Sequence, residues 1–128
     1  MTRLLLVALG GAIGASARYG LGVLALRLAP GAAWPWGTFA ANVFGGLAMG
    51  LLVGWLSLKA GAHQETIRLF AAVGLLGGFT TFSAFSLETA LMIERRDYAL
   101  AAGYVAASVI VCVAALFVGL MLMRRLAA

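Results

Sequence analysis

The sequence predicts an all-α membrane protein with four transmembrane helices per chain, and two observations carry this prediction. Hydrophobic residues make up 64% of the 128 positions and charged residues only 10%, whereas soluble domains have roughly 45–50% and about 25% of these classes. The few charged residues also divide the chain into four long apolar intervals. A spanning helix needs about 20 residues, so we expect a single transmembrane domain over residues 1–128.

The first expected span covers residues 4–28 and contains Arg18. Its beginning also fits a secretory signal, because Arg3 precedes an apolar run and the small residues 15–17. Cleavage there would leave three spans, so the class of protein would not change. The second expected span covers residues 36–58, directly after Pro35, a favourable residue ahead of a helix.

The third expected span covers residues 67–93 and differs from the others in its middle. Adjacent glycines and several hydroxyl residues lie between residues 74 and 86. Such a stretch is a poor helix former, so we expect the third helix to be broken at mid-membrane. A charged turn at residues 94–97 follows, and the fourth expected span covers residues 98–123 without any charge.

The positive charges are nearly balanced between the two sides of the membrane. Four spans place both termini on one side, and basic loops favour the cytoplasmic side. The terminal side carries Arg3, Lys59, Arg68, Arg124 and Arg125, and the other side carries Arg27, Arg95 and Arg96, with Arg18 in addition if it reaches that way. A difference this small does not fix the orientation. We therefore expect dual topology, with two copies paired antiparallel.

Two ionisable side chains stand out inside the expected spans, where such groups usually face protein or water. Arg18 either extends to the lipid headgroups or lines a water-filled vestibule. Glu88 lies near the charged end of the third span and is either an interfacial acceptor or part of an ion pathway. Both are candidate functional residues.

Neutral polar residues recur at helical spacing. Thr38 and Asn42 are four residues apart in the second span, and Tyr104, Ser108 and Cys112 repeat every four residues in the fourth. Each set therefore lies along one helix face. Hydrogen bonds between helices would be a sufficient role for such residues. A buried amide such as Asn42 needs partners for two donor hydrogens and an acceptor oxygen, so it is the stronger functional candidate.

The expected break in the third span predicts an ion site. Freed carbonyls suit a small cation, and the N-terminus of the following half-helix suits an anion. Phe82 and Phe85 share a face beside this position. Their ring edges carry partial positive charge and could line an anion path, although plain packing is the alternative role.

Enzymatic and nucleic-acid functions find no support in the sequence. The histidine, His63, lies in a connection, the cysteine is isolated, and no metal-ligand spacing is present. The basic residues are scattered as singles and pairs, so they form no stripe that could follow a phosphate backbone.

Three segments together resemble the small bacterial CrcB/Fluc fluoride channels. They are residues 10–19 (GGAIGASARY), residues 34–38 (WPWGT) continuing to Asn42 and Gly45, and residues 74–85 (GLLGGFTTFSAF). Their order, their spacing and the length of the chain all agree with that family, and the similarity covers nearly the whole chain.

The resemblance implies passive fluoride efflux through an antiparallel dual-topology homodimer in the cell inner membrane, with two pores per dimer and a central structural sodium ion. It implies no partner other than fluoride, lipid and a second copy. Backbone carbonyls of Gly77 and Thr80 would hold the sodium ion. The fluoride pathway would be formed by Phe82 and Phe85 as the aromatic pair, Asn42 and Ser108 as donors, Tyr104 nearby, Arg18 in the vestibule, and Thr38, Thr81, Ser83 and Glu88 as polar lining.

Two other classes remain alternatives. A small multidrug-resistance transporter also has four spans and about this length, but that class needs a membrane carboxylate in its first span. Here the first span contains Arg18 and no acid. A small structural subunit is the other alternative. In such a protein the polar residues at helical spacing would only form hydrogen bonds between helices.

Overall fold

A computed structural model describes residues 1–58, 61 and 63–126, and within this part of the chain every regular element is helical. The described residues therefore confirm the all-α class. Lys59, which enters the charge count above, lies outside them. The elements are α1 (Thr2–Leu28), α2 (Trp36–Leu58), α3 (Gln64–Ile67), the π-helix η1 (Arg68–Leu76), α4 (Gly77–Phe79), α5 (Phe82–Glu94) and α6 (Tyr98–Leu126).

Four helical stretches are long and apolar enough to cross a membrane: Thr2–Leu28, Trp36–Leu58, Gln64–Glu94 and Tyr98–Leu126. Between 11% and 22% of the residues in their most apolar segments are buried inside the chain. Large side chains such as Leu9, Phe117 and Met121 instead point outward. In water this exposed apolar surface would be unfavourable, whereas lipid solvates it, so the chain has the construction of a multi-pass membrane protein.

Local signals set the helix ends. Pro35 directly precedes α2, and its carbonyl accepts the N–H of Phe39 at 3.0 Å. The turn between α5 and α6 has Arg96 at φ 62°. The N–H of Arg96 donates to Ile93 and the N–H of Asp97 donates to Met92, both at 2.9 Å. These two bonds form a Schellman motif, which satisfies the last carbonyls of α5 and reverses the chain.

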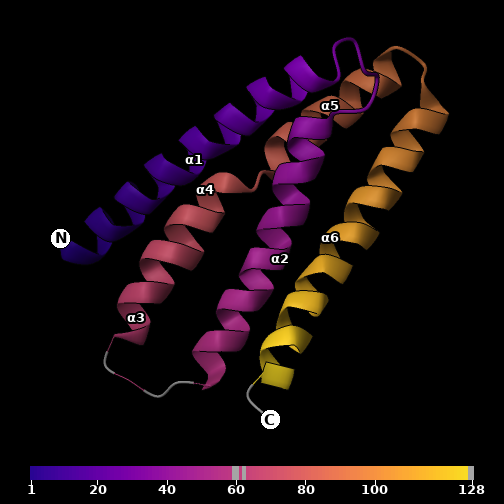
Figure 1. Ribbon diagram of the computed structural model, residues 1–128. Helices are drawn as coiled ribbons and strands as arrows, with labels where there is room; N and C mark the ends of the chain where they lie inside the picture. Colours follow the sequence, from indigo (N-terminus) through magenta and orange to yellow (C-terminus); the bar gives the residue numbers. More distant parts are fainter. Residues whose placement is uncertain (59–60, 62, 127–128) are drawn as a thin grey trace.

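The third membrane-length stretch contains several backbone conformations. In η1 the helix has π-helical pairing, and at its end the Gly77 N–H donates to Ala72, five residues back. After the short α4, Thr80 (φ −80°, ψ 156°) and Thr81 (φ −152°, ψ 121°) are extended before α5 begins. We call Thr80 and Thr81 the extended pair. Figure 1 shows the chain running through this segment from α4 into α5.

Close backbone packing joins the helices into two pairs. In one pair α1 lies along η1 and α4, and in the other α2 lies along α6 (Figure 1). A Cβ added at Gly14 would lie 2.8 Å from the Phe79 nitrogen, and one added at Gly119 would lie 2.7 Å from the Leu51 nitrogen. These positions require glycine because the neighbouring backbones approach too closely for any side chain.

Candidate ion pathway

A groove with a volume of about 320 Å³ brings together residues from α2, α5, α6 and the extended pair. It combines two aromatic rings with hydroxyl, amide and aliphatic groups. None of its lining residues, all of which lie in the described part of the chain, carries a formal charge. They are Asn42, Thr80, Thr81, Phe82, Phe85, Ser108, Val109, Cys112 and Val113.

The two phenylalanines in this groove are in contact. The ring centroids of Phe82 and Phe85 lie 5.4 Å apart, with 42° between the ring planes. Phe82 is 78% exposed, whereas Phe85 is 9% exposed and packs against Tyr104 at 5.3 Å. Phe85 is therefore fixed inside the chain, and Phe82 projects from it.

Ser108 lines the groove and carries an unusual buried polar atom. The residue is 7% exposed, and its Oγ has no hydrogen-bond partner among the described residues. Since a buried hydroxyl without a partner is unfavourable, such atoms in proteins commonly face a ligand or water. The groove is the space that Ser108 borders.

Both polar atoms of the Asn42 side-chain amide form hydrogen bonds with the backbone of Thr81. Its Oδ1 accepts the Thr81 N–H at 2.7 Å, and its Nδ2 donates to the Thr81 carbonyl at 3.0 Å. The Thr81 hydroxyl meanwhile accepts the Ala84 N–H at 3.1 Å and caps α5. Ser83 lies within 3.2 Å of that hydroxyl but is exposed and does not line the groove.

Glu88 accepts two hydrogen bonds from other helices. Thr38 Oγ1 donates to Oε1 at 2.5 Å, and Tyr104 OH donates to Oε2 at 2.6 Å. Tyr104 is fully buried, and its ring lies edge-on to that of Trp34 with centroids 5.3 Å apart. The Glu88 carboxylate of α5 thus joins the two helix faces, on α2 and α6, that carry the predicted polar residues.

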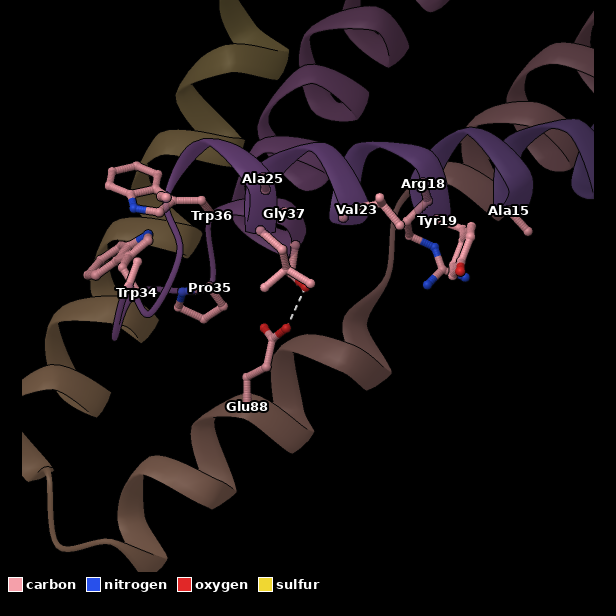
Figure 2. Close-up of a pocket in the computed structure, with 15 residues that line it drawn as sticks. Ala15, Arg18, Tyr19, Val23, Ala25, Trp34, Pro35, Trp36, Gly37 and Glu88 are labelled. Carbon is pink, nitrogen blue, oxygen red and sulfur yellow. Dashed lines mark hydrogen bonds between the residues drawn. The ribbon is translucent and has the colours of Figure 1, made fainter.

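A second cavity, of about 550 Å³, lies between the end of α1, the α1–α2 connection and α5. Arg18 and Glu88 both border it (Figure 2). The dashed line in Figure 2 marks the bond from Thr38 to Glu88. Arg18 Nε donates to the Gly78 carbonyl at 3.2 Å, so this guanidinium is anchored to α4.

The sequence-predicted site residues therefore divide into three sets. One set lines the groove, and a second set (Arg18, Thr38 and Glu88) borders the second cavity. Three residues, Tyr104, Gly77 and Ser83, line neither space, although Tyr104 hydrogen-bonds to Glu88. Trp34 was not predicted as a contact of the pathway residues, although it packs on Tyr104. The WPWGT segment marked Trp34 as a residue of interest. Its contact with Tyr104 could not be predicted, because 70 positions separate the two residues.

Comparison with known proteins identifies the family. The sequence matches the family described as "CrcB-like protein, Camphor Resistance (CrcB)" over residues 5–120. This chain belongs to the CrcB family. A relative from Caulobacter sp. (strain K31) is 63% identical over 126 residues, which cover 98% of each chain, and a relative from Phenylobacterium zucineum is 64% identical with the same coverage. One from Paracoccus denitrificans is 50% identical over 120 residues, 94% of this chain and 93% of its own.

Each of these CrcB relatives is named "Fluoride-specific ion channel FluC". The resemblance found in the sequence motifs is therefore confirmed at the level of the family. A channel family transports ions and catalyses no covalent reaction, which confirms the prediction that the chain is not an enzyme.

Proposed function

We propose that this protein is a fluoride-selective channel that allows passive efflux of fluoride across the cell inner membrane. The single observation that carries the proposal is that Ser108, which lines the groove together with the Phe82–Phe85 pair, has a buried hydroxyl without a partner among the described residues. The names of its relatives give the same ion as the substrate.

The groove offers the kinds of contact that fluoride requires. Fluoride is small and strongly hydrated, so a selective path must replace water with several close donors. Ser108 supplies an O–H group. Asn42 supplies a second amide hydrogen, in addition to the one that it donates to the Thr81 carbonyl. The edges of Phe82 and Phe85 add partial positive charge without a full cation, which would hold the ion too strongly for conduction.

The second cavity supports a role as an aqueous vestibule. Arg18 would attract anions to it, while Thr38 and Tyr104 occupy both oxygens of Glu88 with donated hydrogen bonds. Such bonds reduce the repulsion that a bare carboxylate would exert on fluoride. On the groove side, the Thr81 hydroxyl and the Ser83 hydroxyl next to it would extend the polar lining of the pathway at the start of α5.

An antiparallel second copy would complete the pathway. Phe82 is largely exposed, and Ser83 and Ser86 are exposed on the same short segment of α5. Small polar residues on the outer face of a membrane helix are typical of helix–helix contacts. A second copy with opposite orientation would cover this face, and each copy would contribute one groove, giving two pores per dimer. The near balance of basic residues supports insertion in both orientations.

We further propose that the extended pair divides the third span at mid-membrane and supports a structural sodium ion at the centre of the dimer. The Thr81 N–H, which would pair with the Gly77 carbonyl in a continuous helix, donates to Asn42 instead. The extended dihedrals of Thr80 also turn its carbonyl out of the helical pattern. Carbonyl oxygens are suitable sodium ligands, so Gly77 and Thr80 fit this role. The ion would hold the two copies together through their backbones.

The test is fluoride efflux from liposomes that contain the purified protein, measured with a fluoride electrode and with chloride as the control anion. We expect rapid fluoride efflux and about background chloride efflux. A second series without sodium should show reduced fluoride efflux. Growth rescue of fluoride-sensitive cells, compared with cells on quaternary ammonium compounds, separates this function from drug transport. Absence of fluoride efflux from intact dimers would contradict the proposal.

A further inference from the structure

The backbone around the extended pair loses the hydrogen bonds that a continuous helix would supply. In an α-helix each N–H donates to the carbonyl four residues back. The N–H of Thr80 still donates to Leu76 at 3.0 Å, but the extended dihedrals of Thr80 and Thr81 end this pattern. In a membrane such backbone groups need protein partners, because lipid offers none.

Two side chains from different helices supply those partners. Asn42 on α2 pairs with both the N–H and the carbonyl of Thr81. Arg18 on α1 donates from Nε to the carbonyl of Gly78, three residues earlier in the chain. Asn42 and Arg18 therefore act on the two ends of the segment from Gly78 to Thr81.

The neighbouring helices approach this segment closely enough to make these bonds specific. A Cβ added at Gly78 would lie 2.6 Å from the Gly11 carbonyl oxygen of α1. A Cβ added at Gly45 of α2 would collide with the Thr80 methyl group. Since α1 packs against the segment through its backbone and α2 packs against the Thr80 side chain, Arg18 and Asn42 extend from fixed positions.

We propose that Arg18 and Asn42 are positioning residues that clamp the segment from Gly78 to Thr81 and so fix the start of α5. This inference rests on the proposed function, because α5 carries Phe82 and Phe85 into the groove. In this role Arg18 acts through its Nε hydrogen bond as well as through its charge. Asn42 acts on the pathway by holding the Thr81 backbone, as well as through the amide hydrogen that Thr81 does not accept.

A matched pair of neutral variants isolates the Arg18 hydrogen bond. Arg18→Gln places an amide nitrogen as many bonds from Cβ as Nε is, so the donor remains while the charge is lost. Arg18→Met has similar length and neither donor nor charge. Hydrogen–deuterium exchange of the purified dimer, read on peptides that cover residues 77–84, reports the clamp without any ion flux. We expect exchange about fivefold faster in Arg18→Met than in Arg18→Gln, equivalent to ~1 kcal/mol.

Fluoride efflux provides the second readout. Both Arg18 variants lose the charge, so both should conduct more slowly than the parent protein, but Arg18→Gln should exceed Arg18→Met by about fivefold. Peptides from the α2–α6 contact should exchange equally in all proteins. Equal exchange over residues 77–84 in the Gln and Met variants would overturn the clamp.

Asn42 gives an independent series if Arg18→Met does not fold. Asn42→Asp keeps the acceptor for the Thr81 N–H and loses the amide donor, whereas Asn42→Leu loses both. We expect exchange over residues 77–84 to rise from parent to Asp to Leu, and an Asn42→Leu protein with parental exchange would overturn the proposal. A parent protein that conducts no fluoride would instead contradict the proposed function, while the exchange series would still be readable.

Discussion

The phenol of Tyr104 donates a 2.6 Å hydrogen bond to Glu88, and this bond links α6 to α5 at a fully buried ring. The other carboxylate oxygen accepts the Thr38 hydroxyl of α2. One acidic side chain therefore fixes three helices around the two spaces that border the site. The aromatic contacts of Tyr104 with Phe85 and Trp34 extend this arrangement to the groove and to the α1–α2 connection.

Tyr104→Phe should destabilise the protein and slow fluoride efflux. The ring would still fill its site, but Oε2 of Glu88 would lose a buried donor, a change that costs about 1–3 kcal/mol. Thermal unfolding in detergent and liposome efflux measure the two effects. Tyr98→Phe is the matched control because Tyr98 is exposed. Equal stability of the two variants would show that the Glu88 bond contributes nothing.

Ser108→Ala should separate stability from conduction. Its hydroxyl has no partner among the described residues, so removing it should leave the unfolding temperature unchanged or slightly higher. Fluoride efflux should fall about tenfold, equivalent to ~1.4 kcal/mol, because a donor is lost from the path. Ser16→Ala serves as the control, since the Ser16 hydroxyl is exposed and donates to the Ala12 carbonyl of its own helix. Unchanged efflux in Ser108→Ala would remove Ser108 from the pathway.

Phe82→Ile should abolish fluoride efflux while the proposed dimer remains intact. Isoleucine keeps an apolar side chain but has no ring edge with partial positive charge. Phe117→Ile on α6 is the control, because Phe117 is also exposed and does not line the groove. Size-exclusion chromatography checks the assembly, and the fluoride electrode measures efflux. If both variants conducted equally well, the aromatic pair would have no role in the path.

Gly14→Ala should destabilise the fold by forcing α1 away from α4. The added methyl group would lie 2.8 Å from the Phe79 nitrogen, and overpacking of this kind costs roughly 1–3 kcal/mol. Gly20→Ala introduces the same methyl group on the same helix where nothing lies within 4 Å. Thermal unfolding should therefore distinguish the two variants, with Gly20→Ala at or above the parent protein. An equally stable Gly14→Ala protein would contradict the close packing of α1 and α4.

Sequence reasoning reached the class of fold and the membrane-length helices because both depend on local apolar content. It also placed Thr38 with Asn42, and Tyr104 with Ser108, on common helix faces, which depends only on helical periodicity. The pairing of Asn42 with Thr81 joins residues 39 positions apart, and no local pattern encodes such a contact. The π-helical pairing of η1 was not predicted, because α- and π-helical residues have similar apolar patterns and differ in which carbonyl each N–H selects.

The glycine contacts within the two helix pairs set unequal limits on how the sequence can diverge. Gly14, Gly50 and Gly119 meet neighbouring backbone, so selection should admit almost no replacement there. Outward positions such as Leu9, Ile110 and Met121 are exposed. Where such positions contact hydrocarbon tails, leucine, valine and phenylalanine are nearly interchangeable. Most differences from orthologues should therefore accumulate on the lipid-facing exterior, where they leave the helix spacing unaltered.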